Sequence, residues 1–270
     1  MKTDRKYILG FVGCGHMGLA IARGSIVSEY LERREICVYD PSEEVQEICR
    51  SESFAVMENM REAAENCHVL VLAVTPQICD AVLDELAGSR INCILSIVTG
   101  VSIAHIQEKL GSDVAVVRAM PNTPLQIREG STALCRSESC KADEYDFVFR
   151  LFRHMGVTRT VPEEQLNAFV SVHGSTPAYF YYLAECILND LVERGIDEET
   201  ARALLVQTLV GSGKLLQKNA SKPISEFIDE VCSKGGTTIQ AVQSMREDGL
   251  QEIIHKANEK CIRRAEELGR

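Results

Sequence analysis

Residues 8–18 read Ile8-Leu-Gly-Phe-Val-Gly-Cys-Gly-His-Met-Gly18, an apolar run followed at once by spaced glycines. The glycines form a G-x-G-x-x-G pattern between a predicted strand and a helix-like run, which is the context that a dinucleotide-binding loop requires. The first glycine permits a tight turn, the second lets the backbone approach a pyrophosphate, and the third lets helix pack on strand. The helix N-terminus then offers free N–H groups to the phosphates. The residues expected to contact the cofactor here are Gly13, Cys14, Gly15, His16, Met17 and Gly18. A tight strand–helix turn without a ligand is the alternative.

A carboxylate follows the second predicted strand, Ile36–Tyr39. Asp40 stands 22 residues after Gly18, where it can accept hydrogen bonds from the adenosine ribose hydroxyls and repel a 2′-phosphate. Glu43 and Glu44 add negative charge, and no arginine follows directly. The cofactor is therefore NADPH or NADH, and Asp40 favours NADH. Alternatively, Asp40 is only a turn or cap residue.

Residues 1–162 alternate short apolar runs with amphipathic stretches, which is typical of strands and helices that wind a parallel sheet. The runs are apolar throughout, so we expect helices to cover both faces of the sheet. This half is predicted to be an α/β Rossmann domain with a doubly wound, mainly parallel sheet. The expected strands are Tyr7–Val12, Ile36–Tyr39, Val69–Val74, Ile94–Val98, Val114–Arg118 and Ser131–Cys135; the expected helices are Met17–Leu31, Glu43–Arg50, Ile78–Leu86 and Ile103–Leu110; Tyr145–Phe152 and Val157–Val161 close the domain.

Residues 163–270 lack strand-like runs and show long helical patterns instead. The segment Ala203–Val210 is apolar around most of its circumference, and a domain of about 105 residues can hardly bury such a helix alone. We therefore expect an all-α dimerisation domain; a self-contained bundle is the alternative. The expected helices are Gln165–Val172, Pro177–Arg194, Glu198–Leu216, Ile224–Val231, Ile239–Met245 and Leu250–Leu268.

The composition predicts a soluble, cytoplasmic enzyme. The net charge of −10 argues against a generic nucleic-acid or anionic-membrane partner. The first apolar stretch, Tyr7–Val12, is too short for a secretory signal, and no window approaches the ~20 apolar residues of a membrane helix. The 11 cysteines include no CxxC pair, so we interpret them as buried hydrophobes and expect no metal. Cys14, in the glycine loop, is the one candidate for a reactive thiol.

Five further blocks span the chain in order: Leu72-Ala-Val-Thr-Pro-Gln77, Ser96-Ile-Val-Thr-Gly-Val101, Val117-Arg-Ala-Met-Pro-Asn-Thr-Pro124, Gly174-Ser-Thr-Pro-Ala-Tyr179 and Glu230-Val-Cys-Ser-Lys-Gly-Gly-Thr-Thr-Ile239. Together they resemble the signature blocks of the pyrroline-5-carboxylate reductase family. The resemblance implies a Rossmann domain and a helical domain that interlocks with its twin in a homodimer, often assembled into a decamer. It also implies a reaction in which hydride from a nicotinamide attacks the C=N carbon of pyrroline-5-carboxylate, giving L-proline.

The resemblance also implies roles for residues in these blocks. Val74, Thr75 and Pro76 would line the adenosine side of the cofactor; Thr99, Gly100, Met120, Pro121 and Asn122 would surround the nicotinamide; Ser233, Gly236, Thr237 and Thr238 would hold the substrate, with the catalytic Thr238 hydroxyl near the ring nitrogen.

The Gly-Gly-Thr-Thr turn suits a carboxylate on physical grounds as well. It leads into a predicted helix whose first N–H groups are free and carry the positive end of the helix dipole. The alternative is an ordinary helix cap, with Thr237 or Thr238 as the N-cap residue. No obvious His/Asp pair is present, which is compatible with imine reduction because a protonated iminium is already electrophilic.

Four positions depart from the family pattern. Thr75 replaces a usual Lys, His173 a Ser, Lys234 a Pro and Ser221 a Glu. Without the lysine a phosphate-bearing cofactor is less well supported, while His173 and Lys234 can bring positive charge to the carboxylate site. The chain is then either an NADH-leaning reductase or one adapted to a related imine acid; neutral drift and a non-catalytic regulatory protein are alternatives. A 3-hydroxyacid dehydrogenase is disfavoured, because the Gly174–Tyr179 block offers no Lys.

Overall fold

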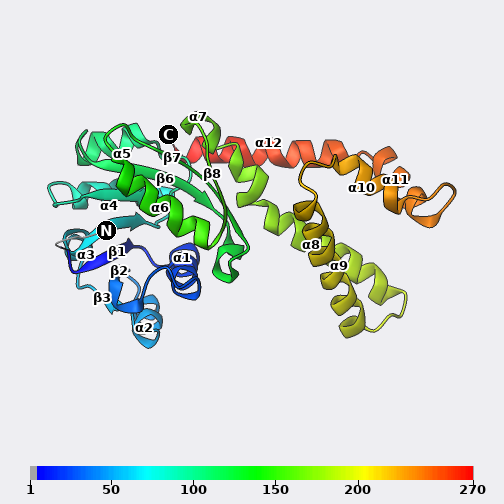
Figure 1. Ribbon diagram of the computed structural model, residues 1–270, viewed down its shortest axis with the longest axis horizontal. Coiled ribbons are helices and arrows are strands. Elements are labelled where there is room, and N and C mark those ends of the chain that lie inside the picture. Colours follow the sequence, from blue (N-terminus) through cyan, green and yellow to red (C-terminus); the bar gives the residue numbers. More distant parts are fainter. Residues whose placement is uncertain (1–4, 270) are drawn as a thin grey trace. The chain divides into compact units, whose positions relative to one another are not determined.

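The computed structural model describes residues 5–269, and within that range one sheet has the strand order β3-β2-β1-β4-β5-β6-β7-β8 (Figure 1). Neighbouring strands are parallel except β6 and β7, which are antiparallel. The prediction of a mainly parallel, doubly wound sheet is therefore confirmed. The strands are β1 (Tyr7–Val12), β2 (Ile36–Tyr39), β3 (Ala55–Val56), β4 (Cys67–Leu72), β5 (Cys93–Ser96), β6 (Ala115–Pro121), β7 (Gly130–Arg136) and β8 (Gly156–Thr160).

Within the described residues the helices that connect these strands are α1 (His16–Val27), α2 (Glu43–Ser51), α3 (Met60–Asn66), α4 (Pro76–Leu86), α5 (Ile103–Leu110), α6 (Ala142–His154) and α7 (Glu163–Leu166), with short 3₁₀ or π turns η1 (Arg33–Glu35), η2 (Thr123–Ile127) and η3 (Val170–Gly174). Of these helices, α2, α4 and α5 begin and end within two residues of the predicted bounds.

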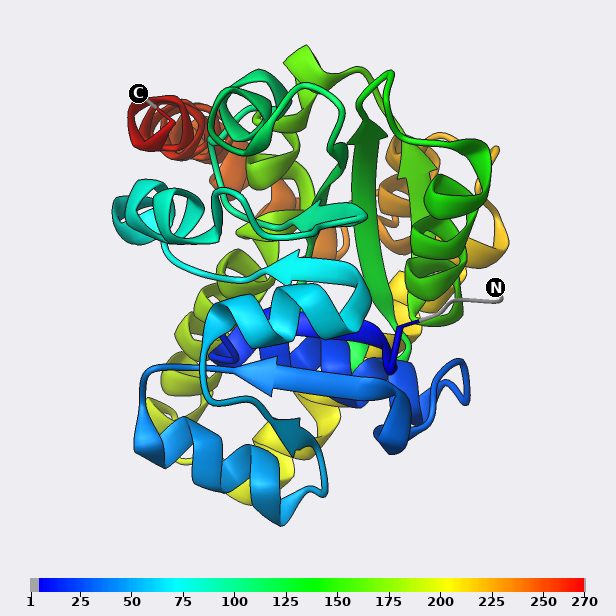
Figure 2. The ribbon, with the colours of Figure 1, turned by 90° about the vertical axis from the view of Figure 1, so that its left-hand side faces the viewer.

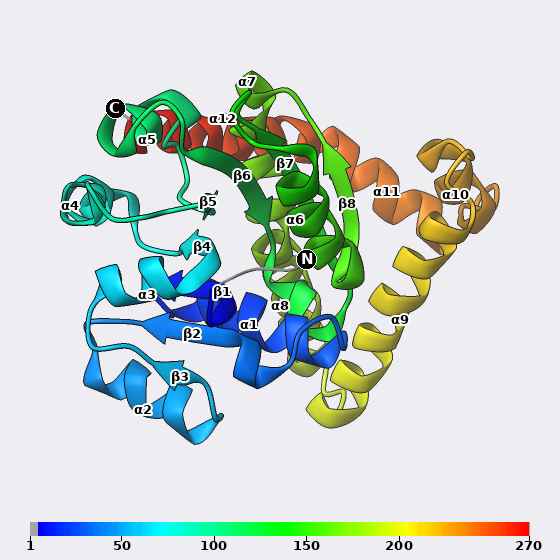
Figure 3. The same cartoon turned by 60° about the vertical axis from the view of Figure 1, so that its left-hand side comes forward.

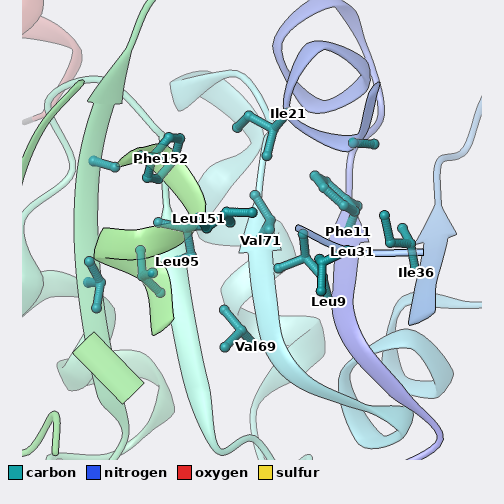
Figure 4. Close-up of a cluster of buried hydrophobic side chains, with 14 of the residues drawn as sticks. Leu9, Phe11, Ile21, Leu31, Ile36, Val69, Val71, Leu95, Leu151 and Phe152 are labelled. Atoms are coloured by element: carbon teal, nitrogen blue, oxygen red, sulfur yellow. The ribbon is translucent and has the colours of Figure 1, made fainter. Parts of the chain in front are cut away.

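Helices cover both faces of the sheet (Figure 2 and Figure 3). On one face Phe11 and Val71 pack against α1 and α6, and Figure 4 shows Ile21 and Phe152 pointing toward them. On the other face Leu70 packs with buried side chains of α3, α4 and α5. Apolar side chains on both faces explain why the strands are apolar throughout instead of alternating.

Beta strand β1 marks the point at which the connections reverse direction. Leu9 pairs with Ile36 of β2 on one side and with Val69 of β4 on the other. The chain builds β1, β2 and β3 outward in one direction, then crosses back to place β4 beside β1. In open α/β sheets ligands bind outside the carboxyl ends of the strands at such a switch point. The glycine loop lies there.

Three local predictions were wrong or incomplete. The predicted Gln165–Val172 helix is broken into α7 and η3, and α1 ends at Val27 because Glu29 takes a left-handed conformation with φ 58°. Neither β3 nor α3 was predicted, since two and seven residues give too little periodicity to detect.

After η3 the described chain is helical. The helices are α8 (Thr176–Glu193), α9 (Glu198–Lys218), α10 (Ile224–Val231), α11 (Thr237–Glu247) and α12 (Leu250–Leu268). The chain divides into two compact units, one of which comprises Pro177–Lys260, while the other contains the sheet and takes in the chain from Cys261 onward. Among the described residues no helix is both long and apolar enough to cross a membrane.

The helical unit exposes large apolar side chains that the chain itself leaves uncovered. Tyr182 on α8 is 68% exposed, and on α9 Leu204 is 67% and Val206 51% exposed. These exposures agree with the expectation that the helical unit alone cannot bury the apolar segment Ala203–Val210.

Candidate functional site

The three glycines of the first loop serve different purposes. Gly13 has φ 86°, and a Cβ there would stand 2.5 Å from the Ala73 carbonyl oxygen. A Cβ on Gly18 would stand 2.8 Å from the Gly13 carbonyl oxygen, so both positions require glycine for packing. Gly15 is the N-cap of α1 and has no heavy atom within 4 Å of its Cβ position. The open side of the loop is therefore at Gly15, where the free N–H groups of the α1 N-terminus begin.

Asp40 anchors this loop. Its Oδ2 accepts a hydrogen bond from the Cys14 N–H at 2.7 Å, and its Oδ1 accepts one from the Ser42 N–H at 2.9 Å. The side chain is buried. Asp40 is thus a turn residue, as the alternative interpretation held, and it also ties β2 to the glycine loop. Two backbone donors leave a carboxylate with further acceptor capacity.

The Cys14 thiol is not a reactive group. Contact with the Cys49 side chain, together with burial in the core, raises the pKa of Cys14 well above its ordinary value. A thiol that stays protonated is a poor nucleophile, so the expectation of reactivity was wrong. Cys14 holds the loop through its backbone N–H, which donates to the Asp40 carboxylate. His16 is exposed and begins α1 with Met17 beside it.

The segment after Asp40 is acidic and its arginine is already paired. Glu43 and Glu44 occupy the first turn of α2, whose N-cap is Ser42. The Arg50 guanidinium donates to Glu43 at 2.7 Å and also to neighbouring side chains of the same helix. Its charge is therefore balanced within α2.

The other predicted cofactor residues lie at the same edge of the sheet, at the carboxyl ends of β4, β5 and β6. Each set follows the carboxyl end of a parallel strand: Val74, Thr75 and Pro76 after β4, Thr99 and Gly100 after β5, and Met120, Pro121 and Asn122 at the end of β6. Thr75 is exposed and is the N-cap of α4, although its side chain makes no capping hydrogen bond. Gly100 has φ 85° and lies against the backbone of Ala265, in the last turn of α12, and of Gly269, which follows that helix.

A partly buried ion pair supports two of these segments and was missed by the sequence analysis. Glu163 Oε1 accepts hydrogen bonds from Arg118 Nη1 at 2.7 Å and from the Ile103 N–H at 2.8 Å. Arg118 precedes Met120 by two residues on β6, and Ile103 begins α5 shortly after Gly100. The partners are far apart in sequence, so no local pattern could have found them.

His173 contacts the end of β6. Its Nε2 lies 2.6 Å from the Met120 carbonyl oxygen, and burial lowers the pKa of the ring. Burial disfavours the charged ring, which argues against the hypothesis that His173 brings positive charge to the carboxylate site.

The predicted substrate residues form a turn in the helical unit. Gly235 has φ 75°, and Gly236 is the N-cap of α11, with its N–H donating to the Ser233 carbonyl at 3.0 Å. Thr237 and Thr238 follow as the first two helical residues, so the alternative in which either one is the N-cap was wrong. Neither hydroxyl has a hydrogen-bond partner among residues 5–269, and both are available to a ligand.

The surroundings of this turn leave it accessible. Thr238 borders a hollow of about 370 Å³ lined by apolar side chains of α9, α10 and α11, including Leu215 and Phe227. Lys234 is exposed within the turn, and Ser221 is exposed in the loop before α10.

Two family models match separate parts of the chain. Residues 163–268 match the model for pyrroline-5-carboxylate reductase dimerisation. Residues 8–100 match the model for an NADP oxidoreductase, coenzyme F420-dependent.

Relatives match over nearly the whole chain. The pyrroline-5-carboxylate reductase of Escherichia coli is 32% identical over 97% of this chain and 98% of its own, and that of Synechocystis is 33% identical over 97% and 98%. The pyrroline carboxylate reductase of Plasmodium falciparum, solved with NADP bound, has a TM-score of 0.90 at 26% identity and covers 99% of this chain and 100% of its own. That of Streptococcus pyogenes has a TM-score of 0.87 at 28% identity, covering 96% and 98%.

Proposed function

The chain belongs to the pyrroline-5-carboxylate reductase family, and we propose that it reduces the C=N bond of 1-pyrroline-5-carboxylate to give L-proline, with NAD(P)H as the reductant. The observation that carries this proposal is the extent of the relationship. It covers 97% of the chain and so includes both the glycine loop and the Gly-Gly-Thr-Thr turn.

The residues at the carboxyl edge of the sheet fit a nicotinamide dinucleotide. Gly15 leaves open space beside the free N–H groups of α1, where a pyrophosphate would bind. The other residues proposed to hold the cofactor are Gly13, Cys14, His16, Met17, Gly18, Asp40, Val74, Thr75, Pro76, Thr99, Gly100, Met120, Pro121 and Asn122.

The chain's own residues bind and orient the imine acid. NAD(P)H, when bound, supplies the hydride. In our proposal the carboxylate is held by the backbone N–H groups at the start of α11 and by the hydroxyls of Ser233 and Thr237, with Gly236 allowing close approach. The Thr238 hydroxyl holds the proton on the ring nitrogen. A hydroxyl suffices, because the protonated iminium is already electrophilic and needs orientation more than a strong acid.

We further propose that the enzyme prefers NADH. The charges around the adenosine side support this: Asp40 ends β2, Glu43 and Glu44 begin α2, and Arg50 is paired within that helix. Thr75 adds no positive charge where the family usually has a lysine. A 2′-phosphate would therefore meet net negative charge with no free cation on the β2–α2 segment.

We also propose that the chain forms a homodimer through its helical unit, assembled further into a decamer. The exposed apolar side chains of α8 and α9 support burial against a second copy. Sedimentation at micromolar concentration tests this, and a monomeric species there contradicts it.

The experiment that tests the reaction is the initial rate of NADH and of NADPH oxidation with pyrroline-5-carboxylate, measured side by side with detection of L-proline. Faster turnover with NADH supports both the reaction and the cofactor preference. Faster turnover with NADPH keeps the reaction and removes the argument from Asp40. Absence of turnover with either cofactor removes the reaction, and a related imine acid or a non-catalytic cofactor-binding role takes its place.

A further inference from the structure

The turn η3 is an unusual element beside the proposed nicotinamide region. Its hydrogen bond runs from the Ser175 N–H to the Val170 carbonyl at 2.7 Å, five residues apart, which makes it a π turn. The Thr176 hydroxyl lies 2.6 Å from the Ser171 carbonyl oxygen and 2.8 Å from that of Val172, and so satisfies backbone acceptors that the wide turn leaves free. Single π turns are rare and are frequently found at functional sites.

This turn holds Met120 by its backbone and by its side chain. His173 Nε2 lies 2.6 Å from the Met120 carbonyl oxygen. Because a carbonyl oxygen can only accept, Nε2 carries the proton and the neutral ring leaves Nδ1 without one. The Met120 thioether sulfur lies 3.7 Å from the Cβ position of Gly174, so the next residue of the turn packs on the same methionine.

A second hydrogen bond closes the arrangement from the other direction. Asn122 Nδ2 donates to the His173 carbonyl at 3.3 Å, while Asn122 Oδ1 accepts from the Ser131 N–H at 2.8 Å. Two hydrogen bonds therefore join the end of β6 to the π turn, one through the His173 side chain and one through the Asn122 side chain.

The two hydrogen bonds through His173 and Asn122, called the clamp below, lie where β6 no longer has a parallel neighbour. The last β5–β6 pair is Ser96 with Arg118, so Met120 lies two residues beyond the point where β6 has a parallel neighbour. A backbone segment that has lost one strand neighbour needs another donor to fix it. His173 supplies a donor for Met120.

We propose that His173 is a positioning residue for hydride transfer, which fixes the Met120 carbonyl and thereby the backbone of Met120–Asn122, the segment proposed to contact the nicotinamide. The inference rests on the proposed reductase function. Hydride transfer depends on alignment to within a fraction of an ångström, so loosening this backbone slows the chemical step more than it weakens substrate binding.

Two substitutions distinguish the effect of losing the hydrogen bond from the effect of changing the side-chain volume. His173→Leu removes the donor, whereas His173→Gln retains an N–H at a similar reach. We expect kcat to fall between about 10- and 100-fold in His173→Leu, with the KM for the imine acid changed less than about threefold. We expect His173→Gln to recover most of the loss. His105→Leu is the matched control, since His105 is paired with Asp80 on the surface and its loss should leave kcat unchanged.

A second readout does not depend on turnover. Nitrogen-15 NMR of the histidine rings, assigned by the signals that vanish in His173→Leu, should show His173 protonated at Nε2 with a slowly exchanging proton. A wild type that turns over, with His173→Leu matching His105→Leu in kcat, overturns the positioning role and leaves the reductase function intact. A proton at Nδ1 with none at Nε2 overturns the hydrogen bond to Met120 itself. A wild type without turnover, but with the Nε2 proton present, overturns the proposed function and with it this role, while showing that the clamp forms.

Discussion

Removal of the Glu163 carboxylate should destabilise the sheet-containing unit measurably. Glu163→Ala deprives the Arg118 guanidinium, whose side chain is 4% exposed, and the Ile103 N–H of one shared acceptor. Breaking a fully buried ion pair from one side costs about 3–5 kcal/mol. The Glu163 side chain is 34% exposed, so water can partly solvate the abandoned guanidinium and the expected loss falls to about 2–3 kcal/mol. In a domain of this size that corresponds to a melting temperature roughly 5–10 °C lower.

Thermal and urea denaturation of three variants test this reasoning. Asp146→Ala is the control, because Asp146 pairs with Arg150 on one helix face where the side chains are 54% and 64% exposed, and its loss should cost less than about 0.5 kcal/mol. Glu163→Gln keeps an acceptor without the charge and should fall between the other two. If Glu163→Ala is no less stable than Asp146→Ala, the ion pair does not hold β6 and α5 together.

Further predictions concern the glycine loop, the cofactor and pH. Gly15→Ala should leave the melting temperature unchanged and weaken cofactor binding at least about tenfold. Gly18→Ala should lower the melting temperature, because its Cβ meets the Gly13 carbonyl. If both variants lower the melting temperature equally, the space at Gly15 is not open. Asp40→Asn should raise kcat/KM for NADPH relative to NADH by about 5- to 100-fold, the effect of removing one charge near a phosphate, and an unchanged ratio would remove Asp40 from cofactor selection. Burial lowers the pKa of His68 below its ordinary 6.5, so the unfolded chain takes up the proton first and stability falls as the pH drops below about 6.5. In His68→Gln the denaturation midpoint should therefore change less between pH 7 and pH 5 than in the wild type. The same pH dependence in both proteins would refute this.

The sequence alone was sufficient wherever a feature depends on neighbouring residues. Tyr7–Val12, Ile103–Leu110 and Ile224–Val231 were predicted with their observed bounds, because apolar runs and helical periodicity are local signals. The glycine loop was predicted because its spacing is tied to a strand before it and a helix after it.

The sequence was insufficient where distant residues or backbone strain decide the structure. The helical pattern continues through 165–172, yet the chain breaks into α7 and η3, and η3 is held to β6 through His173 and Met120. Thr237 and Thr238 have good N-cap side chains, but the left-handed Gly235 turns the chain so that Gly236 takes that position. Amino-acid composition reveals neither the break within 165–172 nor the residue that caps α11.

The charges beside the proposed adenosine side of the cofactor disfavour an added phosphate. On the cofactor side Thr75 lacks the usual lysine, Asp40 is a carboxylate held by two backbone N–H groups, and Arg50 is neutralised within α2. The proposed preference for NADH rests on these charges, because a 2′-phosphate beside Asp40 would find no lysine at position 75. The exposed Lys234 lies in the turn that is proposed to hold the anionic imine acid.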